Sequence, residues 1–337
     1  MAARRPPQSL TRVNYAVFVT VTSTDVAKAA GVSRAAVSQI LNGRGERFAP
    51  ATRDRVQQIA RELNYQPSAA ARTLARGASE LVVGLLPHTT FGGHLQDVVD
   101  TLTDELSAAG LTLVLRFSDS SSHSFERLVQ TMRPLAVVSI TRLRDSDRSL
   151  LTELGIRLVE PHLDAREPVD HRIGRMQAEH LVSRGYTRLA YAHLRDRRED
   201  PFGPARADGV RDACRQAGLP ATPILNLGID ADEARRELNR LDLPRYAIAC
   251  YNDDVAIALL SAAREAGLRV PEDLALIGMD NTPISNLVSP RLTTIETDIR
   301  GAGLRMAQMI VRSVTGGTTE DDSDEQVPLR VVERATT

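Results

Sequence analysis

From Leu81 onward, short apolar runs alternate with longer amphipathic stretches, and this alternation limits the fold more than any other feature of the sequence. Each run is too short for a buried helix, and most are rich in Val, Ile or Leu, as strands are. Several of the stretches between them end in a glycine, which suits the left-handed position just after a helix. The predicted strands are Leu81–Pro87, Leu111–Phe117, Leu135–Ile140, Ile156–Pro161, Arg188–His193, Tyr246–Tyr251 and Leu274–Met279, and the glycines are Gly110, Gly185, Gly218 and Gly267.

Strands and helices that alternate in this way predict an α/β fold with a doubly wound parallel sheet, covered by helices on both faces. The clearest helical patterns are Leu95–Ala109, Ile173–Arg184, Ala207–Ala217 and Val255–Ala266. This part of the chain is large for a single sheet of this kind, so we expect two lobes.

Residues 21–65 instead have the pattern of short, closely spaced helices. Thr22 is placed to cap a first helix, and Asp25, three positions later, can reach back to the Thr22 amide in a capping box. Gly31 can supply the left-handed turn that a tight corner between two helices requires. The first helix should therefore end at this glycine.

A second helix, Arg34–Asn42, is predicted directly after the corner, with Ser33 as its cap and Val32 and Val37 as a hydrophobic staple. Any two packed helices in a bundle could use this chemistry, but the close spacing of the signals favours a helix-turn-helix. A third helix, Pro50–Leu63, would close the small core, and Ala49 is a poor cap for it. The residues expected to bury the contact between the first two helices are Val26, Ala27, Ala30, Val37, Ile40 and Leu41.

A helix-turn-helix places the start of its second helix in the major groove of DNA. At that leading edge Arg34 can pair with guanine, Gln39 can pair with adenine, and Ala35 can offer only a methyl contact. Side chains beside this edge are better placed for phosphates, which fix position without reading sequence. We assign the phosphate role to Ser33, Ser38, Arg53 and Arg55.

The distribution of charge agrees with a nucleic-acid partner at one end only. Residues 1–80 hold 12 Lys and Arg against 5 Asp and Glu, a net charge of +7, and the rest hold 30 against 38, a net charge of -8. A basic segment joined to an acidic body suits one polyanionic partner, although a solvated face gives a similar bias.

The two cysteines, Cys214 and Cys250, have neither disulfide nor zinc spacing, which favours a reducing compartment. Residues 1–20 have too short an apolar run for a secretory signal, and no apolar span is long enough for a membrane helix. We therefore expect a cytoplasmic protein with no membrane partner, in which residues 1–20 are a disordered extension or follow from a wrongly chosen start codon.

The sequence resembles the lactose-repressor (LacI/GalR) family of bacterial transcriptional regulators. The resemblance runs from the head to nearly the end of the chain. It is carried by Thr24–Ser33, Ala36–Asn42, Thr52–Arg53, Leu63–Pro67, Arg269–Asn281 and Ser289–Ile295.

In this family the connector after the head forms a short hinge helix that pairs with its dimer mate in the minor groove of the operator. The resemblance implies such a helix at Pro67–Leu74, within a hinge and linker at residues 66–80. Ala71 and Leu74 would contact DNA, and Leu74 matches the leucine that is wedged into a central base step. A plain Ala-rich linker is the alternative. A helix this short is marginal alone, so it would fold only when docked.

The region at residues 81–333 is similar to the periplasmic sugar-binding-protein fold, in which two doubly wound lobes hold a ligand between them. The resemblance implies crossovers near residues 167, 294 and 322. Lobe one would comprise residues 81–166 and 295–320, and lobe two residues 167–293 and 327–333.

Arg206, Asn252 and Asp280 match the effector-contacting positions of the family. Asn252 or its neighbour could instead cap the next helix, and Asp280 could cap a turn. The first lobe departs from the family pattern after its opening strand, where His88 and Phe91 are candidates for the lining of the cleft. Val169–Arg172 also departs from the family pattern. The resemblance favours a sugar or related metabolite, with a nucleoside as a further alternative.

The function predicted from these observations is that of a homodimeric, sequence-specific DNA-binding regulator that recognises a pseudo-palindromic operator and is controlled by a small-molecule effector, and we expect it to be a repressor. No nucleophile elbow, P-loop, dinucleotide-binding glycine pattern or metal-spaced cluster suggests an enzyme, a metal site or a cofactor. The alternative is a sugar-binding protein of the same fold without a DNA role. The sequence leaves open which effector binds, whether it releases or promotes DNA binding, which genes are controlled, and whether the outcome is repression or activation.

Overall fold

The computed structural model describes residues 21–41, 43, 45–65, 79–87, 95–117, 122–160, 167–196, 200–316 and 327–337. The chain divides into two compact units, of which the first ends at Gly77 and the second begins at Ala78. The amide of Ser79 donates to the carbonyl of Arg133, and the amide of Thr112 donates to the carbonyl of Glu80. The last three residues of the predicted linker, 78–80, therefore belong to the second unit.

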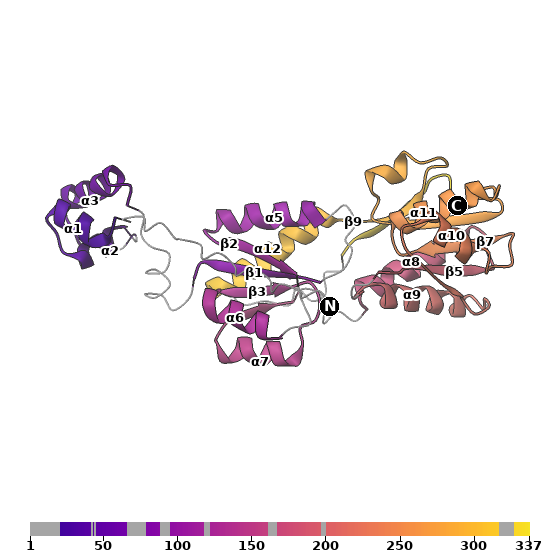
Figure 1. Cartoon of the computed structure of the whole chain (residues 1–337), viewed down its shortest axis with the longest axis horizontal. Coiled ribbons are helices and arrows are strands. Elements are labelled where there is room, and N and C mark those ends of the chain that lie inside the picture. Colours follow the sequence, from indigo (N-terminus) through magenta and orange to yellow (C-terminus); the bar gives the residue numbers. More distant parts are fainter. Residues whose placement is uncertain are drawn as a thin grey trace, which may run out of the picture. The chain divides into compact units, whose positions relative to one another are not determined.

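The first unit contains the three predicted helices, α1 (Ser23–Ala30), α2 (Arg34–Leu41) and α3 (Pro50–Glu62) (Figure 1). The capping box is confirmed, because the Thr22 amide donates to Asp25 Oδ2 at 2.8 Å and the Asp25 amide donates back to Thr22 Oγ1. The hydrogen bond from the Thr22 side chain is the main cause that lowers the pKa of Asp25. Gly31 follows with a φ of 65°, as the tight corner requires.

The core of this unit lies where the three helices meet. α1 contributes Val26, Ala27 and Ala30, α2 contributes Val37 and Ile40, and α3 contributes Val56 and Ala60. The predicted staple residue Val32 packs against this cluster, whereas Leu41 is only partly buried. Ala49 gives α3 no side-chain cap, in agreement with the sequence.

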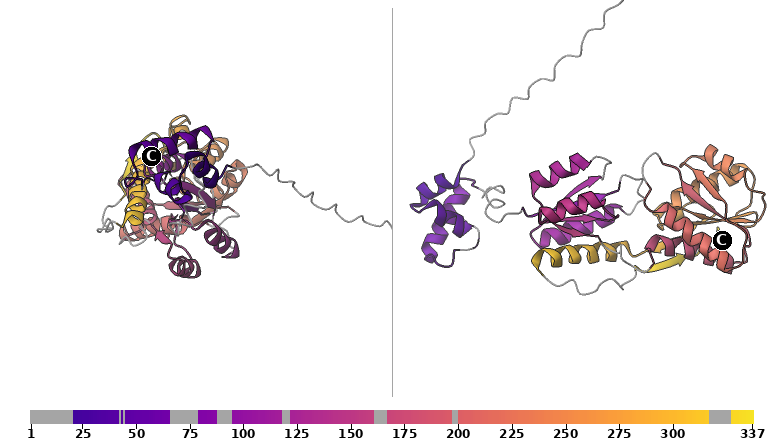
Figure 2. Two further views of the ribbon diagram at one scale, coloured as in Figure 1. Left: turned by 90° about the vertical axis from the view of Figure 1, so that its left-hand side faces the viewer. Right: turned by 90° about the horizontal axis from the view of Figure 1, so that it is seen from below.

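The first lobe of the second unit is a parallel sheet whose strands lie in the order β2-β1-β3-β4. The strands are β1 (Leu81–Leu86), β2 (Thr112–Phe117), β3 (Ala136–Ser139) and β4 (Arg157–Val159). One face is covered by α5 (Leu95–Ala108) and α12 (Ile299–Thr315), and the other by α6 (Ser122–Met132) and α7 (Asp145–Glu153) (Figure 1). Successive side chains of β1 point to opposite faces of the sheet. Val82 packs in the cluster with α12, and Val83 packs in the cluster with α6. Figure 2 shows α12, which comes from near the end of the chain, lying along this lobe.

The second lobe is a sheet in the order β10-β9-β8-β7-β5-β6, parallel except for β10. Its strands are β5 (Leu189–Leu194), β6 (Ile224–Leu227), β7 (Tyr246–Cys250), β8 (Leu274–Met279), β9 (Thr293–Thr297) and β10 (Leu329–Val332). Figure 1 shows α8 and α9 on one side of this sheet and α10 and α11 on the other. These helices are α8 (Val169–Ser183), α9 (Gly203–Gln216), α10 (Ala231–Leu238) and α11 (Asp253–Glu265), and a short 3-10 helix, η1 (Pro283–Asn286), follows β8.

The predicted α/β architecture with two parallel-sheet lobes is thus confirmed, and all four predicted glycines have a positive φ. The crossover expected near residue 294 differs from the structure. It falls inside β9, which pairs along its length with β10 and partly with β8, so residues 295–297 lie in the second sheet. The second lobe also continues past residue 333, because Thr336 accepts and donates hydrogen bonds with β8 and β9. Among the residues that the structure describes, no helix is both long and apolar enough to span a bilayer.

Candidate functional site

The outer face of α2 carries the residues expected to read DNA. Ser33, Arg34, Ala35 and Ser38 are exposed and Gln39 is half-buried, whereas the next residues around the helix pack inward. Ser33 also caps α2, because its Oγ accepts from the Ala36 amide at 3.1 Å. Its hydroxyl proton remains available to a phosphate oxygen. The core therefore fixes one side of α2 and leaves the other to a partner.

Arg47, which the sequence analysis did not single out, donates from its guanidinium to Gln39 Oε1. Its guanidinium carbon lies 5.1 Å from the centre of the Phe48 ring. Arg47 therefore holds the side chain of a predicted base-reading residue. Arg53 is half-buried in the first turn of α3. Ala71 and Leu74 lie outside the described residues.

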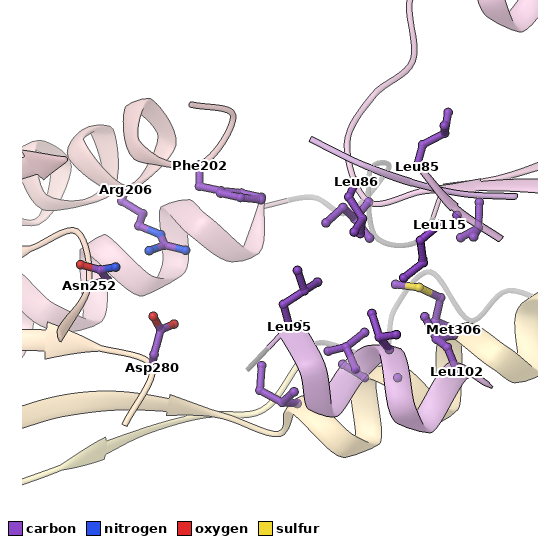
Figure 3. Close-up of a pocket in the computed structure, with 18 of the residues that line it drawn as sticks. Leu85, Leu86, Leu95, Leu102, Leu115, Phe202, Arg206, Asn252, Asp280 and Met306 are labelled. Carbon is purple, nitrogen blue, oxygen red and sulfur yellow. The ribbon is translucent and has the colours of Figure 1, made fainter. Parts of the chain in front are cut away.

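In the second unit, Arg206, Asn252 and Asp280 line one pocket with a volume of about 240 Å³. They come from α9 and from the ends of two parallel strands, β7 and β8. Figure 3 shows their polar groups facing a common space, opposite apolar side chains of the first lobe. The sequence placed Asn252 and Asp280 at the carboxyl ends of strands, where a doubly wound sheet presents ligand groups, and Arg206 followed from the family resemblance alone.

Arg206 is buried and held on two sides. Its Nε donates to Asp170 Oδ1 at 2.8 Å, and its Nη1 donates to the carbonyl of Tyr251 at 2.6 Å. The guanidinium carbon lies 4.9 Å from the centre of the Tyr251 ring and 5.8 Å from that of Phe202. Burial opposes the charged form, but attraction to the carboxylates of Asp170 and Asp280 raises the pKa of Arg206 above its usual value. The pocket therefore contains a fixed positive charge.

Asn252 is buried at the start of α11, where its Oδ1 accepts from the Val255 amide at 3.0 Å. The structural role considered for it, a helix cap, is thus present. This bond uses the side-chain oxygen and leaves the two N–H donors of the amide group for the pocket. Cap and ligand contact are therefore compatible in this residue.

Asp280 has a φ of 104°, which is strained for a residue with a side chain. Its amide donates to the carbonyl of Ile295 at 2.9 Å. The turn that follows is fixed by the buried carboxylate of Asp253, which accepts from the Thr282 amide at 2.7 Å, from the Thr282 hydroxyl at 2.8 Å and from the Thr294 hydroxyl at 2.6 Å. Burial raises the pKa of Asp253. This network therefore fixes the position of Asp280 at the end of β8.

The first lobe contributes the apolar wall of the pocket. Leu86, Leu102, Leu115, Val138 and Met306 are among its lining residues. A second space of about 850 Å³ shares Leu85, Ile140 and Phe202 with it and is lined by more polar groups, including those of Arg116, Arg142 and Asp170. The remaining two predicted effector residues, His88 and Phe91, lie outside the described part of the chain.

Comparison with known families gives two matches along the chain. Residues 22–68 match the family described as bacterial regulatory proteins, lacI family. Residues 178–337 match the periplasmic binding protein-like domain. The first match covers the three helices of the head, and the second begins within α8 and covers every strand of the second lobe together with α12.

Among characterised proteins, the HTH-type transcriptional regulator GalR of Salmonella typhimurium is 30% identical over 303 residues, which cover 85% of this chain and 87% of GalR. The chain belongs to the lacI family. The HTH-type transcriptional repressor PurR of Aliivibrio salmonicida is 28% identical over 86% of this chain and 91% of its own length.

Solved structures of lacI-family proteins share the fold. The lac repressor dimer bound to operator and the anti-inducer ONPF superimposes with a TM-score of 0.78 at 22% identity, covering 94% of this chain and 99% of that chain. A LacI family transcriptional regulator from Silicibacter pomeroyi gives a TM-score of 0.64 at 26% identity, covering 76% of this chain and 98% of that chain.

This lacI-family chain is a DNA-binding transcriptional repressor under small-molecule control, as predicted, and not an enzyme. The alternative of a sugar-binding protein without a DNA role does not hold, because the helix-turn-helix head is itself part of the family match. Sequence reasoning missed Arg47, Asp170, Phe202 and Tyr251, which position predicted residues or line the pocket. Only Asp170 could have been suspected, since it lies in the segment Val169–Arg172 that drew attention as a departure from the family pattern.

Proposed function

We propose that two copies of this repressor, joined through their effector-binding units, place two α2 helices in successive major grooves of a pseudo-palindromic operator. The observation that carries this proposal is the exposed edge of α2, held by a core on its other side. Exposed apolar side chains on the second unit, such as Leu287 at 80% exposure and Phe117 at 52%, are consistent with a surface that a second copy covers. The cytoplasm is the compartment that this role requires.

At each half-site, Arg34 would donate two hydrogen bonds to a guanine and Gln39 would pair with an adenine. Ala35 would contact a thymine methyl group. Ser33, Ser38 and Arg53 would hold phosphates, and Ala71 and Leu74 of the hinge would enter the minor groove. Because Arg47 binds the Gln39 oxygen, it would also fix which face of that amide meets the base.

Arg34→Ala should remove discrimination at one base pair of each half-site, at a cost of about 1–3 kcal/mol against the preferred base. Selection of binding duplexes from a random pool, followed by affinity measurement on single-base variants, would locate the position. Arg61→Ala is a matched control, since it removes an exposed positive charge from the same unit. It should weaken all duplexes alike. Equal base preferences in both variants would contradict the role of Arg34.

Leu74→Ala should weaken binding to the selected operator by about tenfold or more while leaving nonspecific binding nearly unchanged, because only the specific complex has an opened base step. Titrations against operator and random DNA at one salt concentration provide the comparison. Arg72→Ala removes a charge from the same segment and should weaken both complexes, since phosphate contacts carry no sequence information. Equal losses for Leu74→Ala would argue against the wedge.

The effector would bind between the lobes, held by Arg206, Asn252 and Asp280, with His88 and Phe91 as further contacts. Its binding would shift the population of dimers that can dock both hinge helices. Selection from random duplexes with the intact chain, repeated with a panel of sugars and related metabolites, tests the whole proposal. A chain that prefers no duplex under any condition would exclude it.

A further inference from the structure

We propose that the effector is an amphipathic small molecule with two distinct ends. A hydroxyl-bearing end is held by Arg206, Asn252 and Asp280, and an apolar group about as large as a six-carbon ring or chain enters the first lobe. This inference rests on the proposed function, in which the pocket binds the effector. It goes further by excluding a free, fully hydroxylated sugar as the whole ligand.

The pocket has two chemically different ends. Its polar groups all come from the second lobe, whereas the fourteen lining residues of the first lobe, among those the structure describes, are apolar or glycine. Figure 3 shows this division, with Arg206, Asn252 and Asp280 on one side and Leu86, Leu102 and Met306 on the other. A ligand that spans the pocket must therefore change from polar to apolar along its length.

The apolar end is a chamber between the sheet and its helical cover. Leu86 and Val138 belong to β1 and β3, Leu102 to α5, and Ala302 and Met306 to α12. Gly84 has no side chain to occupy this space, and Leu115 leans over it from β2, since a Cβ added at Gly84 would lie 2.9 Å from Leu115 Cδ2. The chamber is thus a recess between the sheet and its helical cover, and one of its lining side chains, Leu115, is still 40% exposed.

The size of the pocket fits a group of this kind. Its volume is about 240 Å³. An apolar cavity of roughly 150 Å³ already takes up benzene and stays free of water when empty. The pocket therefore has room for a ring or a chain of about six carbons together with the polar end that reaches Arg206.

The chemistry of the walls decides what occupies the chamber. A hydroxyl group placed among Leu102, Val138 and Met306 would lose its hydrogen bonds to water without a partner in return, which weakens binding. A methylene group in the same place is removed from water and strengthens binding by about fourfold. A sugar with a hydroxyl on every carbon fits the polar end and is disfavoured at the apolar end.

The polar end of the pocket suits a ligand group that both accepts and donates hydrogen bonds. Arg206 carries a positive charge and Asn252 retains N–H donors, so both would donate to a ligand oxygen. The Asp280 carboxylate can only accept. A hydroxyl group satisfies both demands at once, because its oxygen accepts and its proton is donated.

The test uses simple alcohols as probes and Met306 as the reporter. The chain has six methionines, so a sample labelled with ¹³C-methyl methionine gives few signals, and Met306→Leu identifies the one from the chamber. Titration of the full-length protein with 1-butanol, 1-pentanol and 1-hexanol should move this signal, with affinity increasing about fourfold for each added methylene. 1,6-Hexanediol should bind at least about fivefold more weakly than 1-hexanol, because its second hydroxyl enters the chamber.

Two variants of α12 show whether the probe enters this chamber. Ala302→Phe fills it and should reduce 1-hexanol affinity at least about tenfold. Leu304→Phe adds the same ring on the same helix at a residue that does not line the pocket, and should leave the affinity unchanged. Thermal unfolding of both variants checks that they fold, and the titration of the unmodified chain remains decisive if one does not.

An affinity that stays flat along the alcohol series, or a diol or D-glucose that binds as well as 1-hexanol at Met306, would overturn the inference. Operator binding is measured separately on the same samples. A chain without any operator preference would defeat the proposed regulatory role and leave the alcohol titration interpretable. A chain that binds operator but takes up only sugars would overturn the inference of an amphipathic effector and leave the proposed regulatory role standing.

Discussion

Arg206→Ala should lower the free energy of unfolding of the second unit by about 3–5 kcal/mol and abolish the response to effector. The reason is that this change leaves the Asp170 carboxylate, whose side chain is 16% exposed, without the guanidinium that now binds it. The carbonyl of Tyr251 would also lose its donor. Denaturant unfolding of the variant measures the first effect, and operator binding with and without effector measures the second.

A double change separates the contribution of the ion pair to stability from the proposed role of Arg206 in effector binding. In Asp170→Ala combined with Arg206→Ala no charge is stranded, so most of the lost stability should return, while the response to effector stays absent. Arg206→Lys keeps a charge but cannot reach Asp170 and the Tyr251 carbonyl with the same fork of donors. It should fold and bind effector more weakly. A double variant that is as unstable as Arg206→Ala would show that packing, not charge, accounts for the loss.

The pH dependence of the stability lost in Arg206→Ala gives an independent check. Burial is the main cause that raises the pKa of Asp170 above its ordinary value of 3.8, and Arg206 opposes this rise. Without Arg206 the pKa in the folded variant should rise further. A protonated Asp170 carries no charge and needs no cationic partner. The loss of stability in Arg206→Ala should therefore be small below the pKa that Asp170 has in the unfolded chain. It should grow as the pH rises through the pKa that Asp170 has in the folded variant. A deficit that does not change with pH would contradict this explanation.

The head unit could be predicted nearly residue by residue because its structure is set by local chemistry. Thr22 and Asp25 form their capping box between neighbours in sequence, and Gly31 turns the chain by its own conformation. Such signals are complete within a few residues. Arg47 was missed for the opposite reason, since its contact with Gln39 depends on how the loop before α3 folds back over α2.

The strands of the second unit were predictable where they are buried on both faces. β7 and β8 are continuous apolar runs, as central parallel strands are. β6 and β9 have no such run. β6 lies at the edge of its sheet with alternate residues exposed, and β9 is rich in threonine that is buried through hydrogen bonds rather than apolar contacts. Its sequence therefore resembles a loop.

For the candidate site, the sequence could indicate residues that stand at strand ends but not those that hold them in place. Asn252 and Asp280 follow directly from the ends of β7 and β8. Asp170 lies 36 positions before Arg206, and their contact follows from the packing of α8 against α9. The sequence analysis placed the starts of α8 and α9 too late for a related reason. α8 and α9 begin at Val169 and Gly203 without a side-chain cap, so the sequence carries no start signal there.

Gly209→Ala should be as disruptive as the loss of Arg206, although alanine is the better helix former. The α8 and α9 backbones touch at two glycines. A Cβ at Gly209 would lie 2.0 Å from the carbonyl oxygen of His171, and a Cβ at Gly174 would lie 1.9 Å from that of Arg206. Since the obstacle is backbone, the helices must separate, and the contact between Asp170 and Arg206 must lengthen with them.

Helix propensity alone would make Gly209→Ala stabilising by up to about 1 kcal/mol, so the sign of the change is decisive. We expect instead a loss of about 3 kcal/mol or more in the free energy of unfolding, together with weaker effector binding. Asp208→Ala, next to it on the exposed side of α9, should change stability little. Because one separation relieves both clashes, Gly174→Ala combined with Gly209→Ala should cost clearly less than the sum of the two single changes. Strict additivity, or a stabilised Gly209→Ala, would mean that the helices do not depend on this contact to hold Arg206 in the pocket.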